Sequence, residues 1–150
     1  MRKETIMKTM KINILILVIL LACSFGYSQS SKFKVVVNDA NSISEITKHE
    51  LSDIFLKKTS KWSDNKKIEP INLDADSNTR QAFAKSVHNK SVNAINAYWQ
   101  KKIFTGKGVP PVEKRSDAEI ITFVKENPGA IGYVSSNASV TGVKVVMVKD

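Results

Sequence analysis

The residues best suited to binding chemistry lie in a short polar stretch that follows a predicted apolar strand over 67–73. Ser77, Asn78, Thr79 and Arg80 come after a turn of three residues, and we expect a helix to begin at Ser77. The first turn of a helix leaves backbone N–H groups unpaired and carries partial positive charge, so it attracts anions. Side chains that donate hydrogen bonds add to this effect. The stretch is therefore predicted to bind an anion.

A purely structural role for the same stretch remains open. Ser77 is a good helix N-cap, and Arg80 could then lie on the surface without a ligand. A glycine-rich loop at 104–111 presents the same choice. It could contact an anion or dock a partner, or it could be only a tight turn. As a phosphate cradle it is a weak motif, because no Walker pattern surrounds it.

Residues typical of catalysis or metal binding do not cluster in the sequence. His49 and His88 fall on different predicted helices without an acid or a second histidine at ligand spacing, so we expect both on the surface. Asp74 and Asp76 are predicted to be turn residues, and no serine–histidine–acid arrangement is visible. We predict a protein without catalytic activity, metal or cofactor.

The positive charge of the chain indicates a preference for anionic partners. The net charge is +9, from 23 basic and 14 acidic residues. Residues 1–28 contain four of the basic residues and one acidic residue, which leaves a net charge of +6 for the remainder. Because the lysines are scattered and never form a run longer than a pair, nucleic acid is not a predicted partner.

The first 28 residues are predicted to be a signal peptide. Basic residues precede an aliphatic run over 12–22, which is about half the length that a membrane-spanning helix needs. Cleavage before Gln29 is one interpretation, and lipid attachment at Cys23 is the other. Either predicts a periplasmic or secreted protein. Cys23 is the only cysteine, so an internal disulfide is excluded.

Residues 29–150 are predicted to form one domain in which strands and helices alternate. Strands are expected over 33–37, 67–73, 130–134 and 143–148, and helices after the N-cap residues Thr47, Ser77, Ser91 and Ser116. Two of these starts, Thr47 with Glu50 and Ser116 with Glu119, have the spacing of a capping box. The third helix is expected to pack through an apolar face made of Ile95, Tyr98, Trp99 and Ile103. This alternation predicts an α/β fold with a mixed sheet flanked by helices.

Three segments carry a resemblance to the substrate-binding proteins of phosphate ABC transporters, in the periplasmic-binding-protein superfamily. They are Leu51–Trp62, Ser77–Phe83 and Asn127–Val134. Members of full length have two lobes with the anion between them, and this sequence has the length of about one lobe. The resemblance therefore implies one lobe of a type II periplasmic-binding-protein-like fold.

The same resemblance implies a ligand and a partner. Ser77 and Thr79 match the serine and threonine of the family's Ser-Gly-Thr turn, which donates hydroxyl and N–H groups to phosphate. Asn78 replaces the glycine, and Leu73 stands about where the family has an arginine, for which Arg80 could substitute. The expected ligand is phosphate or a similar oxyanion, and the expected partner is a membrane transporter or an envelope protein. The alternative is an envelope protein-interaction or structural module that has lost ligand binding.

Overall fold

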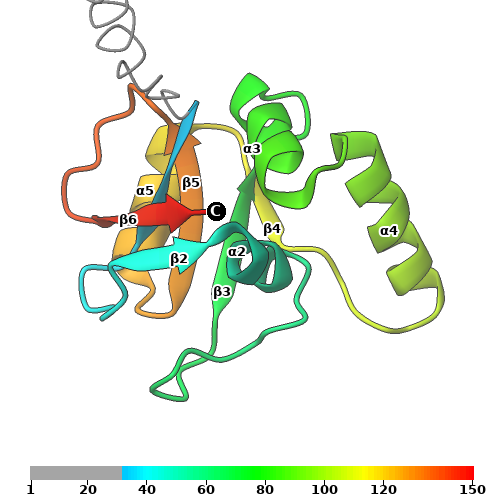
Figure 1. Cartoon of the computed structure of the whole chain (residues 1–150), viewed down its shortest axis with the longest axis horizontal. Coiled ribbons are helices and arrows are strands. Elements are labelled where there is room, and N and C mark those ends of the chain that lie inside the picture. Colours follow the sequence, from blue (N-terminus) through cyan, green and yellow to red (C-terminus); the bar gives the residue numbers. More distant parts are fainter. Residues whose placement is uncertain (1–31) are drawn as a thin grey trace, which may run out of the picture. The chain divides into compact units, whose positions relative to one another are not determined.

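The computed structural model describes residues 32–150, whose central feature is a mixed sheet of six strands (Figure 1). The strands are β1 (Phe33–Val37), β2 (Glu45–Thr47), β3 (Glu69–Leu73), β4 (Val112–Lys114), β5 (Ala130–Ser135) and β6 (Lys144–Lys149). Their order across the sheet is β2-β6-β1-β5-β3-β4. β1 runs antiparallel to β5 and β6, whereas the other three pairs are parallel. The predicted α/β fold with a mixed sheet is confirmed.

Helices cover both faces of this sheet (Figure 1). They are α2 (Lys48–Phe55), α3 (Asn78–His88), α4 (Val92–Phe104) and α5 (Asp117–Glu126). Successive residues of β5 show the two faces, because side chains alternate along a strand. Gly132 faces Ile120 of α5, whereas the ring of Tyr133 stacks on Phe83 of α3 at 3.8 Å between centroids. α4 packs against α3.

The core differs in character between the two faces. On the side of α2 and α3, four aromatic rings form one cluster: Phe33, Phe55, Phe83 and Tyr133. On the side of α5, the helix lies so close to β5 that a Cβ on Gly132 would be 2.8 Å from Cγ2 of Ile120. Only glycine fits this close approach without displacing the helix.

The helix starts largely follow local sequence. Thr47 and Glu50 form the predicted capping box, and the serines before α3, α4 and α5 each cap their helix. Of the two hydrogen bonds that the predicted capping box at Ser116 requires, only the first forms, so this prediction is wrong in its second bond. The hydroxyl of Ser116 accepts from the N–H of Glu119, but the Glu119 carboxylate accepts from the N–H of Arg115.

Three other details differ from the sequence-based expectations. The short strands β2 and β4 were not predicted. Ile103 of α4 was expected on the packed face of the helix but is 53% exposed, and only Ile95 and Trp99 of this helix are buried, in a small cluster with Leu56. The predicted signal peptide and Cys23 lie outside the described residues. Between residues 32 and 150, no helix combines the length and apolarity needed to cross a membrane.

Candidate functional site

The predicted anion site is the junction between β3 and α3. Ser77 has an extended backbone, and its hydroxyl accepts a hydrogen bond from the N–H of Arg80 at 3.4 Å. No hydrogen bond within residues 32–150 engages the N–H groups of Asn78 and Thr79. Asn78 is exposed, and Ser77 and Thr79 are half-buried. The junction therefore presents two unpaired backbone donors at the positive end of an 11-residue helix.

Arg80 points into the protein, so the expectation that it could be a surface residue is wrong. Only 3% of it is exposed. Its Nη1 donates to the carbonyl oxygen of Leu73 at 2.8 Å, and Nη2 lies 3.2 Å from Oε1 of Glu113 on β4. A buried charge needs such partners. Arg80 thus connects the start of α3 to the end of β3 and the middle of β4, and Glu113 balances its positive charge.

A second buried polar contact lies beside this arginine. The hydroxyl of Tyr133 donates to Oδ1 of Asn72 at 3.1 Å, and both residues are buried. Burial raises the pKa of Tyr133 to about 12, and the positive charge of Arg80 opposes this rise. The sequence contained one signal for this contact, the polar residue Asn72 between Ile71 and Leu73 in the predicted strand 67–73.

His88, at the end of α3, is not the surface residue that the sequence suggested. Its Nδ1 lies 2.8 Å from the hydroxyl of Ser52, and its ring meets the edge of Phe83. Burial, together with the positive charge of Arg80, lowers the pKa of His88 to about 4. The imidazole is therefore neutral near pH 7. His49 is exposed and lies 3.4 Å from Asp53.

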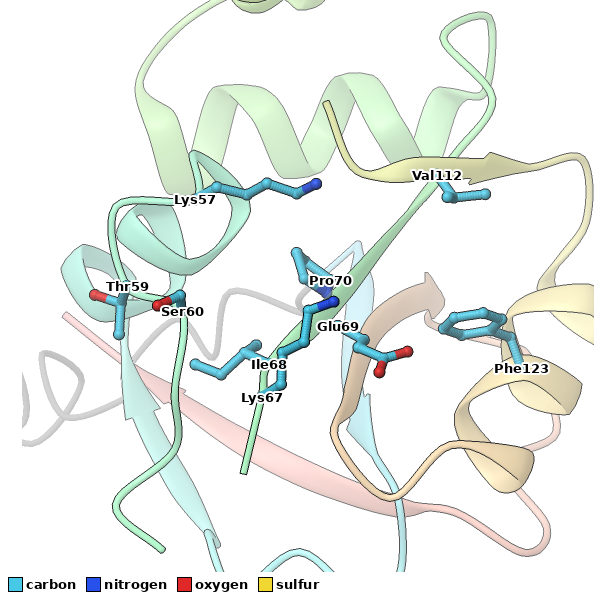
Figure 2. A pocket seen from close by; sticks show the side chains of 9 residues that line it. All are labelled: Lys57, Thr59, Ser60, Lys67, Ile68, Glu69, Pro70, Val112 and Phe123. Atoms are coloured by element: carbon cyan, nitrogen blue, oxygen red, sulfur yellow. The ribbon is translucent and has the colours of Figure 1, made fainter. Parts of the chain in front are cut away.

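A cavity of about 310 Å³ lies elsewhere, beside the beginning of β3 (Figure 2). It is lined by Lys57, Thr59, Ser60, Lys67, Ile68, Glu69, Pro70, Val112 and Phe123. A more open hollow of about 260 Å³ adjoins α5. Ser77–Arg80 line neither of them. The structure brings Ser77, Asn78 and Thr79 together at an accessible helix end, without enclosing them in either cavity.

A mixed sheet covered by helices on both faces, with a strand, turn and helix that leave N–H groups free, defines an α/β lobe of the periplasmic-binding-protein type. The chain belongs to the PBP superfamily, because residues 29–147 match the model of a PBP superfamily domain. No curated protein matches the sequence.

Several solved structures share the fold. An ABC-type phosphate transport receptor from Vibrio cholerae aligns with 78% of this chain at a TM-score of 0.63 and 21% identity. A putative phosphate ABC transporter substrate-binding protein from Clostridium perfringens was solved with bound phosphate. It aligns with 78% of this chain at a TM-score of 0.61 and 22% identity. A possible phosphate binding protein from Planctomyces limnophilus aligns with 79% of this chain at a TM-score of 0.58 and 24% identity.

These alignments cover 46%, 44% and 42% of the three structures, respectively. The chain therefore spans less than half the length of each of these proteins. At this level of identity the likeness shows the fold. It confirms the resemblance to phosphate transporter substrate-binding proteins and the partial, single-lobe extent of the match.

Proposed function

We propose that this protein is an exported, non-enzymatic binding module that holds phosphate or a similar oxyanion at the N-terminus of α3. Ser77, Asn78, Thr79 and Arg80 form the proposed site. The observation that carries the proposal is the pair of unpaired N–H groups of Asn78 and Thr79, beside two hydroxyls at an accessible helix end. The phosphate in the Clostridium perfringens structure, which shares the fold, supports this choice of ligand.

The electrostatics of the site predict weak binding. Glu113 neutralises Arg80 at 3.2 Å, and the exposed carboxylates of Asp74 and Asp76 precede the helix. A single lobe also leaves the anion half in water, where each hydrogen bond contributes less than in an enclosed site. We expect a dissociation constant of about 1 mM, which corresponds to about 4 kcal/mol of binding free energy.

Calorimetric titration with inorganic phosphate tests the proposal. Ser77→Ala removes a proposed contact but also an N-cap, which costs about 1 kcal/mol of stability. Ser91→Ala and Ser116→Ala are matched controls, because each removes the serine that caps another helix. Phosphate affinity should fall only in Ser77→Ala. If wild-type protein releases or absorbs no heat at millimolar phosphate, the proposal is refuted.

Glu113→Gln probes the role of Arg80 in the opposite direction. The substitution removes the negative charge that balances the guanidinium, so the potential at the start of α3 becomes more positive. Phosphate should then bind several-fold more tightly, although the fold loses stability because a buried charge has lost its partner. Unchanged affinity would exclude Arg80 from the proposed site.

The second proposed function is an envelope protein-interaction or structural module that has lost ligand binding. The ion pair of Arg80 with Glu113 favours it, because the guanidinium already has protein acceptors. A ligand that binds only the folded state raises the melting temperature. A melting temperature that does not change with phosphate, together with a silent calorimetric titration, would favour this second function.

The proposed location is the periplasm or the extracellular space, with a membrane transporter or an envelope protein as the partner. The N-terminal segment supports this proposal through its basic start and aliphatic run. Mass spectrometry of the mature N-terminus distinguishes cleavage before Gln29 from lipid attachment at Cys23. Detection of the uncleaved chain in cells would contradict export by this route.

A further inference from the structure

The cavity beside the beginning of β3 has the composition of a ligand site separate from the α3 junction. We propose that it binds a small organic monocarboxylate with an apolar body, whose carboxylate is held by Lys57 and Lys67. The proposal does not depend on phosphate binding. The two sites lie at opposite ends of β3, because the cavity contacts residues 68–70 and the α3 junction follows Leu73.

Two lysines from separate segments line this cavity. Lys57 follows α2, and Lys67 precedes β3; in Figure 2 the Lys57 side chain extends toward the strand of Val112 and that of Lys67 toward Pro70. Lys57 Nζ donates to the carbonyl oxygen of Pro110 at 3.3 Å, which leaves two of its three donors available. Partial burial and the charge of Lys67 lower the pKa of Lys57. An anion between the two lysines would offset both effects.

The charges of the lining favour a ligand with one negative charge. Lys57 and Lys67 contribute two positive charges, and Glu69 contributes one negative charge. A monocarboxylate would bring the occupied cavity to neutrality. Inorganic phosphate is a poorer match, because part of it carries two negative charges near pH 7 and because it has no apolar group.

The remaining walls favour an apolar ligand body. Ile68 and Pro70 are buried, Phe123 is half-buried, and Val112 contributes an exposed methyl surface at the rim. Contact with such walls removes apolar ligand surface from water. A volume of about 310 Å³ is at the small end of the range for ligand pockets, so the ligand should be the size of benzoate.

The backbone of Lys57 gives an independent reason to assign this site. Its φ of 52° is in the left-handed region. The N–H of Lys57 donates to the carbonyl of Ile54, and that of Lys58 donates to the carbonyl of Asp53, which is the pattern of a Schellman motif. Glycine is the usual residue at this position because a side chain is strained there. Lys57 occupies this strained backbone position, and its side chain lines the cavity. Backbone strain of this kind is typical of functional sites.

Titration of ¹⁵N-labelled protein with benzoate, followed by amide chemical shifts, tests the assignment. We expect saturable shifts at the amides of Ile68, Val112 and Phe123. Benzamide has nearly the same shape without the charge, and it should bind at least about tenfold more weakly because it forms no ion pair with the lysines. Equal binding of benzamide would overturn the role of the lysines.

Matched lysine variants test the two ammonium groups. Lys57→Gln and Lys67→Gln should each weaken benzoate binding by about tenfold. Both lysines are exposed residues, and Lys57 is only partly buried, so both variants should fold, as the dispersion of amide shifts would show. Lys66→Gln makes the same change in net charge one residue away, at a side chain that pairs with Asp64 at 2.8 Å. It should leave benzoate affinity unchanged, and an equal loss in all three variants would overturn the proposal.

The location of the shifts separates this proposal from the proposed oxyanion site. Shifts confined to Asn78 and Thr79 would mean that benzoate binds at the start of α3, and they would overturn the cavity assignment. The absence of shifts up to about 10 mM benzoate would also overturn it, because even a weak site with a dissociation constant of about 1 mM would then be mostly occupied. Failure of phosphate to bind leaves this result unaffected.

Discussion

Replacing Lys57 with glycine should make the fold more stable and remove the proposed carboxylate binding. A non-glycine residue in the left-handed region costs about 1–2 kcal/mol, and Lys57 has a φ of 52°. Glycine removes this strain but increases the freedom of the unfolded chain by about 0.4–1 kcal/mol. The exposed hydrogen bond to Pro110 is long, at 3.3 Å, so it should add no more than the low end of the usual range, about 0.5 kcal/mol. The net gain should be about 0.5 kcal/mol, or about 2–3 °C in melting temperature.

Urea unfolding and thermal melting of Lys57→Gly measure this gain, and the benzoate titration measures the loss of binding. Lys57→Gln separates the two effects, because it keeps the strained backbone and removes the charge. Asn89→Gly is the matched control for the backbone. Asn89 ends α3 with a φ of 51°, but asparagine tolerates this conformation, so its replacement should gain less. If Lys57→Gly is less stable than wild type, or gains no more than Asn89→Gly, the strain argument is refuted.

Three further predictions concern the core. Tyr133→Phe should cost about 1–3 kcal/mol in urea unfolding, because Oδ1 of buried Asn72 loses its donor. The pKa of His88 is lowered from 6.5 to about 4 in the folded state. Between these pH values the imidazole is protonated in the unfolded state and neutral in the folded state. Stability should therefore fall as the pH drops from 6.5, by about 2 kcal/mol at pH 5, and His88→Gln should flatten this slope. Gly132→Ala should cost about 1–3 kcal/mol, because its Cβ would lie 2.8 Å from Cγ2 of Ile120.

Each of these predictions has an outcome that contradicts it. An unchanged urea midpoint in Tyr133→Phe would mean that water or another donor reaches Asn72. A slope between pH 6.5 and 5 that persists in His88→Gln would assign the titration to a different group. A neutral effect of Gly132→Ala would show that α5 moves away from the sheet without a loss of packing.

Local signals account for most of the predicted fold. The caps at Thr47 and Ser77 depend on contacts within three residues, so the sequence alone locates them. Pro70 was expected at a strand start or an edge, and it is the second residue of β3, where β4 pairs only from Ile71 onward. β2 and β4 were missed because each has only three residues. Strands this short are defined by their neighbours in the sheet and not by local propensity.

The site was harder to predict because its important contacts are distant in sequence. The residue type of Arg80 suggested an anion ligand, but its partner Glu113 lies on another strand, and only their pairing shows that the guanidinium is buried and neutralised. The cavity could not be predicted for the same reason. Lys57 lies in the turn after α2, Val112 on β4 and Phe123 on α5. A lysine at the end of a helix carries no sequence signal for a left-handed turn, which glycine would have given.

The central position of β1 has a consequence for how the molecule is made. This strand begins at Phe33, yet its two neighbours, β5 and β6, begin only at Ala130 and Lys144. A nascent chain therefore holds β1 without its two neighbours in the sheet until residues 130–149 have been synthesised. Sheets closed by such distant pairings assemble slowly. A product truncated before Ala130 would lose the middle of its sheet rather than one edge, and it should be a substrate for proteolysis instead of a smaller native protein.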